Sequence, residues 1–382
     1  MTHRIAHKFK ELFRSDPVLV RSPGRINIIG EHTDYNDGFV MPAAVDKAIY
    51  FAVKPNNNGL YRFHSFDYNE DYRTDKERID PCEVPWANYL LGVVAQFAKD
   101  GKEIPGFDCV FGGDIPVGAG MSSSAAIETG IAYALNTVFD LGYDKLTMVK
   151  YAQKAEHEYA GVRCGIMDQF AVLFGKNHQA IKLDCRTLSY DYAPIKSDDY
   201  LFVLVNTGVK HSLASSEYNN RRKECHTGVQ ILQQYYPEVE ALRDATEDML
   251  REHQLEFPPV IFDRCQYVIQ ENMRVLFAVE ALGKGNFETL GELMYKTHAG
   301  LRDLYEVSCD ELDVLVEIAR GVNGVLGARM MGGGFGGCTI NLIARNKREE
   351  FKKSMLRKYK TPEGKPPDIV EVEVTSGTSL IE

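Results

Sequence analysis

Three features that would direct a protein to nucleic acid, to a membrane or out of the cell are lacking in this chain of 382 residues. Positive charge is in deficit, because 44 Lys and Arg against 54 Asp and Glu give a net charge of −10. That balance disfavours nucleic acid or an anionic membrane as a partner. No apolar run approaches the roughly 20 residues of a membrane span, and residues 1–8 hold no apolar signal core. We therefore expect a cytoplasmic protein.

Paired cysteines are also lacking. The eight cysteines are scattered along the chain and none belongs to a C-x-x-C pair. In a protein that is not exported, such residues are expected to be packed thiols. The sequence therefore predicts no zinc site.

The composition is otherwise that of a globular protein, with 44% hydrophobic and 26% charged residues. Because the chain is longer than one hydrophobic core usually spans, we expect two domains, residues 1–195 and 196–382. The second is expected to run strand, helix, strand, strand, helix, strand, which is the split βαβ pattern of ferredoxin-like folds. In the first, the charged segment 67–81 is predicted to be a solvated connection.

A first glycine-rich stretch, residues 112–126, follows a predicted strand and leads into a predicted helix, residues 125–138. A helix N-terminus presents free N–H groups and a partial positive charge, so it can seat a phosphate. Gly118 and Gly120 would let the backbone approach such an anion. The serines at 122–124 could cap the helix or reach Mg²⁺. An ordinary capped helix after a tight loop remains the alternative.

A second glycine-rich stretch has five glycines among residues 332–337. A turn between two strands needs only two or three, and each glycine adds chain entropy that folding must overcome. The density indicates backbone that approaches another group closely or moves, with a plain turn as the alternative.

Acidic groups occur at three places where solvated charge is not the only explanation. Residues 31–34, Glu-His-Thr-Asp, suit a neutral polyol, because each hydroxyl can donate to a carboxylate and accept from a ring N–H. A polar turn is an equal alternative. Asp168 is typical of a helix cap or salt bridge, but could accept a hydroxyl proton. Glu156 is typical of a solvated helix face, but with a serine hydroxyl it could hold Mg²⁺.

Four stretches resemble those of galactokinases, which belong to the small-molecule kinase superfamily named after galactose, homoserine, mevalonate and phosphomevalonate. They are PGRINIIGEHTDY (23–35), PVGAGMSSSAA (116–126), CGIMDQF (164–170) and GARMMGGGFGGC (327–338). The first resembles the N-terminal motif of galactokinases, whereas the second and fourth mark only the superfamily. The stretches occur in family order and run over most of the chain.

The resemblance implies a fold and an activity. The fold is α+β with two domains: an N-terminal mixed sheet with helices, like domain 2 of ribosomal protein S5, and a ferredoxin-like C-terminal domain, with the active site in the cleft between them. The activity is phosphorylation of the C1 hydroxyl of α-D-galactose with ATP and Mg²⁺ to galactose 1-phosphate, the first committed step of galactose catabolism by the Leloir pathway. Two alternatives stay open, namely a kinase for a related sugar such as N-acetylgalactosamine or arabinose, and a galactose- and ATP-binding sensor without catalysis.

The resemblance also implies roles for single residues. Asp168 would face the C1 hydroxyl, and Arg25 beside it would keep it ionised and neutralise the moving phosphoryl group. The sugar would be bound by Glu31, His32, Thr33, Asp34, Gly165, Asp168 and Tyr218. ATP would be bound by Gly118, Ala119, Gly120, Met121, Ser122, Ser123 and Ser124, with Trp86 flanking adenine. Mg²⁺ would be held by Ser124 and Glu156.

Two residues depart from the family pattern. Met121 stands where leucine is usual, which conserves side-chain volume. Met331 stands where threonine is common, which removes a hydroxyl near the sugar or the loop and leaves fine substrate selection open. The oligomeric state is not determined by the sequence, and a monomer is compatible with it.

Overall fold

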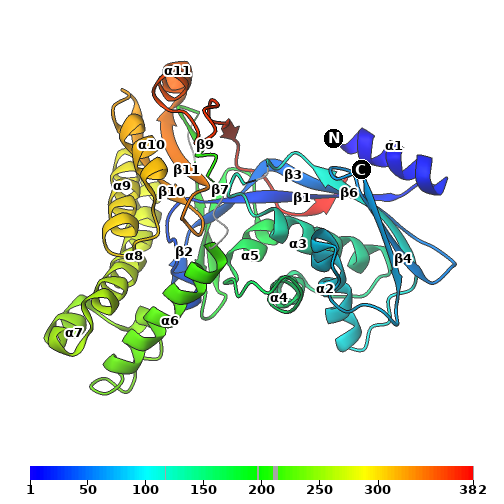
Figure 1. Cartoon of the computed structure of the whole chain (residues 1–382), viewed down its shortest axis with the longest axis horizontal. Coiled ribbons are helices and arrows are strands. Elements are labelled where there is room, and N and C mark those ends of the chain that lie inside the picture. The colour runs from blue at the N-terminus through cyan, green and yellow to red at the C-terminus, as the bar shows by residue number, and fades with distance from the viewer. Residues whose placement is uncertain (117, 196–197, 210–213, 382) are drawn as a thin grey trace.

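The computed structural model describes residues 1–116, 118–195, 198–209 and 214–381. Two lobes lie side by side, with the early part of the chain in one and the long helices of the later part in the other (Figure 1). The predicted boundary between residues 195 and 196 borders residues 196–197, which lie outside the described ranges.

The N-terminal lobe is a six-stranded sheet with helices on both faces, next to a small three-stranded sheet. In chain order its elements are α1 (Thr2–Phe13), β1 (Val18–Asn27), β2 (Phe39–Val40), β3 (Pro42–Pro55), β4 (Leu60–Ser65), β5 (Glu70–Asp75), α2 (Pro85–Lys99), β6 (Phe107–Gly113), α3 (Ser123–Val138), α4 (Lys145–Ala155), a π-helical turn (Glu156–Ala160), α5 (Met167–Phe174), β7 (Gln179–Asp184) and β8 (Tyr190–Pro194).

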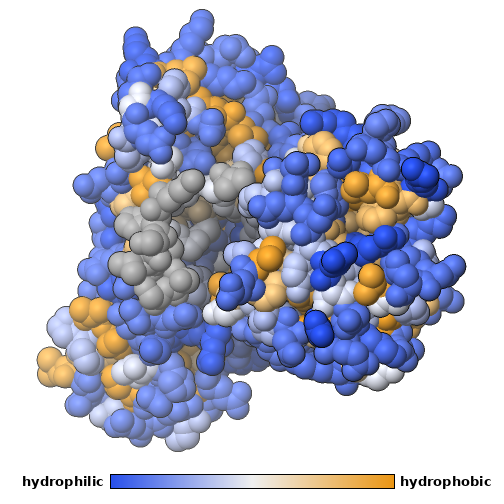
Figure 2. Space-filling model, turned by 45° about the vertical axis from the view of Figure 1, so that its right-hand side comes forward, coloured by the Kyte–Doolittle hydropathy of each residue, from blue (hydrophilic) through white to orange (hydrophobic). Residues whose placement is uncertain are grey.

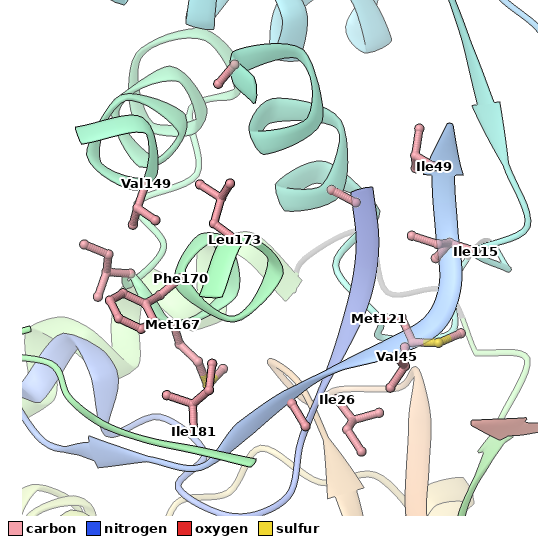
Figure 3. Close-up of a cluster of buried hydrophobic side chains, with 14 of the residues drawn as sticks. Ile26, Val45, Ile49, Ile115, Met121, Val149, Met167, Phe170, Leu173 and Ile181 are labelled. Atoms are coloured by element: carbon pink, nitrogen blue, oxygen red, sulfur yellow. The ribbon is translucent and has the colours of Figure 1, made fainter. Parts of the chain in front are cut away.

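Alternation along the central strands separates two apolar layers. In β3, Phe51 and Val53 belong to the large core of the lobe, whereas Ala52 between them packs with Ile5 and Phe9 of α1. This is the period of two expected of a strand buried on both faces. Helices α2 to α5 lie on the side of the sheet opposite α1 (Figure 1). Figure 3 shows part of the core formed there.

The C-terminal lobe pairs a four-stranded sheet with a layer of helices. Its elements are β9 (Tyr200–Asn206), α6 (Ala214–Leu232), α7 (Glu247–Glu252), α8 (Pro259–Gly283), α9 (Phe287–Asp303), α10 (Asp310–Arg320), β10 (Val325–Met331), β11 (Cys338–Ala344), α11 (Arg348–Lys358) and β12 (Ile369–Val372). The strand order is β10-β11-β9-β12 and every pair is antiparallel. This order confirms the predicted ferredoxin-like arrangement.

The C-terminal sheet is buried on both faces, which explains the uninterrupted apolar run of β9. Leu201, Val203 and Val205 pack with residues of α10 and α11. Phe202 and Leu204, which point the other way, belong to the same core as the N-terminal lobe. The two lobes therefore share one continuous apolar interior.

Two expectations about chain organisation are wrong. The segment 67–81 contains strand β5, which pairs with β4 at the edge of the first sheet. The chain also returns to that sheet at its end, because β13 (Ser379–Leu380) pairs with β1. Residues 196–382 are therefore not one continuous domain, and the C-terminal mark in Figure 1 lies beside α1.

The hydrophilic character of the surface agrees with the composition of a globular protein. Hydrophilic side chains cover most of the face in Figure 2, and hydrophobic ones gather there only in small groups. Within the described ranges, no helix combines the length and the apolar character that crossing a membrane requires.

Candidate active site

Most residues predicted to act on substrate line one cavity of about 300 Å³. Both lobes contribute to its walls, through the end of β1 and the loop after it, the loop before α5, helix α6, and the glycine stretch after β10. The lining residues are Arg25, Glu31, His32, Asp34, Glu156, Val162, Cys164, Gly165, Met167, Asp168, Tyr218, Gly332 and Gly333.

At the centre of this cavity Arg25 and Asp168 form a two-pronged ion pair. Arg25 Nε donates to Asp168 Oδ1 and Nη2 donates to Oδ2, both at 2.7 Å. Burial lowers the pKa of Arg25, but the facing Asp168 carboxylate outweighs that effect and the net shift is upward. A permanently charged guanidinium therefore lies beside a carboxylate whose side chain stays 24% exposed to the cavity.

The same ion pair is fixed to the glycine–serine loop, residues 114–122 between β6 and α3. Arg25 Nη1 donates to the Gly120 carbonyl at 2.5 Å, and the Arg25 backbone N–H donates to the Met121 carbonyl at 3.1 Å. The Ser122 hydroxyl donates to Asp168 Oδ2. The loop is thereby placed directly against the ion pair.

Ser122 does not cap α3 as the sequence suggested. It occupies the N-cap position with a φ of 51°, and its side chain makes no capping hydrogen bond within the described residues. The hydroxyl is instead directed to Asp168. The first N–H groups of α3 thus lack a capping side chain, which suits an anion-binding helix start.

Two glycines of the loop adopt the left-handed backbone that glycine favours, with φ values of 76° at Gly118 and 65° at Gly120. Val117, the residue before them, lies outside the described ranges. Met121 is buried and belongs to the same apolar cluster as Val45 and Ile115, and Figure 3 labels all three. The apolar packing of the thioether side chain agrees with methionine standing in place of leucine at a similar volume.

The loop after β1, residues 28–34, is called the acidic loop below. Its Asp34 is partly buried in the cavity wall, and desolvation followed by repulsion from Asp168 raises the Asp34 pKa to about 7. Gly165 lies against this carboxylate so closely that a Cβ atom at 165 would overlap with it. Asp34 is therefore held in a fixed place facing the ion pair.

His32 lies in the left-handed region with a φ of 61°. Its Nδ1 pairs with the Tyr35 hydroxyl at 2.7 Å, and that hydroxyl pairs with Tyr305 at 2.8 Å. Burial lowers the His32 pKa to about 3, so the ring is neutral at physiological pH. Its Nε2 is buried and makes no hydrogen bond within the described part of the chain. A neutral imidazole nitrogen can exchange a hydrogen bond with an uncharged hydroxyl.

Thr33 and Trp86 are not brought to the cavity. The Thr33 hydroxyl donates to the carbonyls of Gly30 at 3.0 Å and Phe39 at 2.7 Å, so it braces the acidic loop instead of facing substrate. Trp86 is 7% exposed, packs near Phe111, and donates from Nε1 to Glu70 at 2.9 Å. These contacts brace the surrounding structure, and the predicted places of Thr33 at the sugar and of Trp86 at adenine stay predictions.

Glu156 lies at the start of the π-helical turn and is 7% exposed. Burial and then the charge of Asp168 raise its pKa, whereas hydrogen bonds from Cys164, Ser124 and Gln169 lower it. The Ser124 hydroxyl at the start of α3 and the Glu156 carboxylate are thus neighbours. No group of three or more His, Cys, Asp or Glu side chains that could hold a metal occurs among the described residues. A hydroxyl and one carboxylate beside a phosphate seat nevertheless fit Mg²⁺, which takes few protein ligands.

A buried acid behind Glu156 is a feature that the sequence reasoning missed. Glu128 of α3 is fully buried, and burial followed by repulsion from Glu156 raises its pKa far above the usual range. Gln169 Nε2 donates to both carboxylates, at 3.2 Å to Glu128 and 2.7 Å to Glu156. In the sequence, a glutamate between the small and apolar residues of a helix is the only signal of this contact.

Comparisons with known proteins agree with this geometry. The galactokinase galactose-binding signature matches residues 7–55, and the N- and C-terminal domains of GHMP kinases match residues 88–176 and 278–361. A galactokinase of Thermotoga maritima is 43% identical over 95% of this chain and 99% of its own length. The crystal structure of Lactococcus lactis galactokinase complexed with galactose superposes with a TM-score of 0.95 at 34% identity, covering 99% of both chains. The chain belongs to the galactokinase family. The predicted family and two-domain kinase fold are thereby confirmed.

Other members of the wider superfamily share the fold alone. The mevalonate kinase of Methanococcus jannaschii superposes with a TM-score of 0.64 at 18% identity, over 95% of this chain and all of its own length.

Within the galactokinase fold of this chain, one further residue escaped the sequence reasoning. Arg329 of β10 is fully buried and donates from Nη1 to Glu31 Oε2 at 2.6 Å. A charged residue inside an apolar strand was the available signal.

The crowding at Gly165 predicts the effect of a single methyl group. Gly165→Ala places a Cβ atom on the Asp34 carboxylate. That carboxylate is then displaced from its position facing the Arg25–Asp168 ion pair. Because a misplacement of about 1 Å can cost a hundredfold in rate, we expect KM for the sugar to rise by roughly that factor. Gly283→Ala is the control, since a Cβ atom there meets open space. A KM within twofold of wild type in steady-state assays would contradict the packing described here.

Proposed function

We propose that the protein transfers the γ-phosphoryl group of ATP to the C1 hydroxyl of α-D-galactose. The Arg25–Asp168 ion pair carries this proposal, because it lies between the glycine–serine loop and the acidic loop and contacts the first directly. A phosphate seat and a polyol site that share one charged pair match the transfer of a phosphoryl group to a hydroxyl. The galactose named with the Lactococcus lactis galactokinase structure supports the choice of sugar.

The sugar site consists of the groups that face the cavity from the acidic loop and its surroundings. Glu31 and Asp34 offer carboxylate oxygens, and His32 offers a neutral ring nitrogen. The ring of Tyr218 lies 5.4 Å from that of His32 and forms an apolar wall for the sugar. Because Gly165 has no side chain, the Asp34 carboxylate can occupy the space beside it. Such hydroxyl-directed groups suit an uncharged hexose better than a charged metabolite.

Arg25 and Asp168 perform the chemistry in this proposal. The C1 oxygen attacks the γ-phosphorus, the bond to the β,γ-bridging oxygen breaks, ADP leaves, and the proton of the C1 hydroxyl passes to Asp168. Because phosphoryl transfer goes through a loose transition state, little base strength is needed early. Asp168 therefore orients the hydroxyl and accepts its proton late. Arg25 stabilises the negative charge on the moving group.

The nucleotide phosphates are expected to lie on residues 118–124, where the helix start and the left-handed glycines offer free backbone N–H groups. Ser124 and Glu156 would hold Mg²⁺ in this arrangement. When bound, Mg²⁺ neutralises phosphate charge. Ala119, Ser122 and Ser123 belong to the same surface, with Ser122 also fixing Asp168.

Location and assembly are part of the proposal. The eight cysteines are free thiols, which suits the reducing cytoplasm where ATP is made. The cavity described above is lined by residues of one chain, so a monomer is sufficient for activity. The net charge of −10 supports a small-molecule substrate without nucleic acid or membrane partners.

An ADP-release assay with a panel of sugars tests the assignment. We expect release with galactose, ATP and Mg²⁺, and little release without Mg²⁺ or with N-acetylgalactosamine or arabinose in place of galactose. Preference for one of those sugars would replace galactose as the substrate. Binding of galactose and ATP without ADP release would instead indicate a sensor.

The magnesium assignment predicts a shift in metal requirement. Glu156→Gln keeps the side-chain shape but removes the charge, so the Mg²⁺ concentration for half-maximal rate should rise roughly 10- to 100-fold. Glu158→Gln is the matched control, because this carboxylate two residues on pairs with Lys99 and Gln96. An unchanged Mg²⁺ titration for Glu156→Gln would remove Glu156 from the metal site.

A further inference from the structure

The acidic loop contains a completely buried ion pair that bridges the two lobes. Arg329 on β10 is 0% exposed, and its Nη1 lies 2.6 Å from Glu31 Oε2. The two residues are 298 positions apart in the chain. Glu31 lines the cavity, whereas Arg329 lies behind it. Arg329 therefore touches a sugar-facing group without facing the sugar.

The whole guanidinium is directed at the end of β1 and the acidic loop. Nε donates to the Ile28 carbonyl at 3.0 Å, and Nη2 donates to the Asn27 carbonyl at 2.6 Å. Nη1 also donates to the carbonyl of Met330, its own neighbour. Met330 directly precedes the segment that leads to the cavity-lining Gly332. One side chain thus links both edges of the cavity.

Other C-terminal groups hold the backbone of the same loop but not its carboxylate. Tyr267 donates to the Glu31 carbonyl at 2.9 Å, and Gly30 N–H donates to Glu271 at 2.8 Å. Among the described residues only Asn27 shares the Glu31 carboxylate with Arg329, through Nδ2 to Oε1 at 3.2 Å. A carboxylate can accept about four hydrogen bonds. Each Glu31 oxygen therefore keeps an acceptor site for a ligand.

We propose that Arg329 is a positioning residue that sets Glu31 as an acceptor for one hydroxyl of the sugar, and so determines which hydroxyl pattern the cavity accepts. Without the guanidinium, Glu31 would be a buried charge without compensation and would rotate or take up a proton. A protonated or rotated Glu31 no longer presents a fixed acceptor. Lysine cannot replace arginine here, because the planar fork meets three carbonyls and a carboxylate at once. This inference rests on the proposed function.

Variants of the pair test it by calorimetric binding of galactose and of ATP. Arg329→Met should weaken the binding of galactose roughly 30-fold or more and leave the affinity for ATP within threefold of wild type. Arg264→Met is the matched control. Arg264 is also a buried arginine of the C-terminal lobe; it pairs with Glu306 at 2.6 Å and does not line the cavity. Arg264→Met should lower thermal stability without weakening the binding of galactose. Galactose affinity unchanged in Arg329→Met, or weakened as much in Arg264→Met, would overturn the proposal.

A double-mutant cycle with Glu31→Gln separates positioning from general loosening. If Arg329 acts through Glu31, the double variant should bind galactose no more weakly than the worse single variant. Independent, multiplying losses would overturn the proposal. If Arg329→Met does not fold, Arg329→Lys takes its place in the same cycle. Wild-type galactose affinity in Arg329→Lys would also overturn the proposal.

Deoxygalactoses identify the hydroxyl concerned. A buried acceptor discriminates strongly against an analogue that lacks its donor, so one monodeoxy sugar should bind wild type much more weakly than galactose. That discrimination should shrink at least tenfold in Arg329→Met and Glu31→Gln. Equal discrimination in wild type and Arg329→Met would contradict the role of Arg329. Failure of the wild type to bind galactose would contradict the proposed function instead, and the cycle would then be run with the sugar that supports ADP release.

Discussion

Replacing Asp168 by asparagine is expected to lower kcat by roughly three orders of magnitude or more while galactose and ATP still bind. The Asp168 carboxylate is the group of the ion pair that can take the proton of the C1 hydroxyl, and it also holds Arg25 through two hydrogen bonds at 2.7 Å. Asparagine keeps the shape but removes both functions. Rapid-quench measurement of sugar phosphate formation gives the rate of the chemical step directly.

Loss of a buried ion pair could also weaken the fold, so the control must lose an equivalent pair elsewhere. Arg62 and Asp108 form one with the same atoms, at 2.6 and 2.7 Å, between β4 and β6. Asp108→Asn should cost comparable stability and leave kcat unchanged. Near-normal turnover of Asp168→Asn, or an equal loss in Asp108→Asn, would refute the role of Asp168.

Asp34→Asn is expected to have opposite effects on binding and on stability. The folded-state pKa of Asp34 is about 7, above the ordinary value of 3.8 for an aspartate. Between these values the folded protein holds a proton that the unfolded chain has released, so the contribution of Asp34 to stability falls as pH rises from about 4 to 7. Asparagine removes that penalty. The variant should gain about 1–4 kcal/mol in unfolding free energy at pH 8 and little at pH 4.

Asp34→Asn should also weaken the binding of galactose roughly a hundredfold or more, because a fixed carboxylate acceptor becomes an amide. Wild-type affinity should increase as pH rises through about 7, where Asp34 ionises. Urea unfolding and galactose binding at several pH values measure both effects. Asp37→Asn is the control, since this carboxylate on the same turn is about half exposed and pairs with Arg186. A stability difference that does not vary with pH would show that Asp34 is not buried as a raised-pKa acid.

Much of the fold could be predicted because local patterns agree with the final packing. The apolar run of β9, the glycines between β10 and β11, and the periodic helices follow from short stretches of sequence. Strand β5 was missed because it is an edge strand of mostly charged residues, in which only Thr74 is buried. Charged edge strands resist aggregation but do not show the usual apolar alternation. The return of β13 to β1 could not be read from any local signal.

The site shows the same division between local and distant information. Asp34, Arg25 and Asp168 were predicted from motifs. The hydrogen bonds of Thr33 and Trp86 were not predicted, because each depends on what surrounds the side chain in the folded protein. Arg329 meets Glu31 across nearly 300 residues of sequence, and no spacing rule connects them.

The most direct test of the central claim is the fate of C1 itself. Galactose labelled with ¹³C at C1 is incubated with the protein, ATP and Mg²⁺ and followed by ¹³C and ³¹P NMR. The C1 signal is expected to become a doublet split by phosphorus as ADP forms in equal amount. ADP formation with an unsplit C1 signal would contradict the central claim.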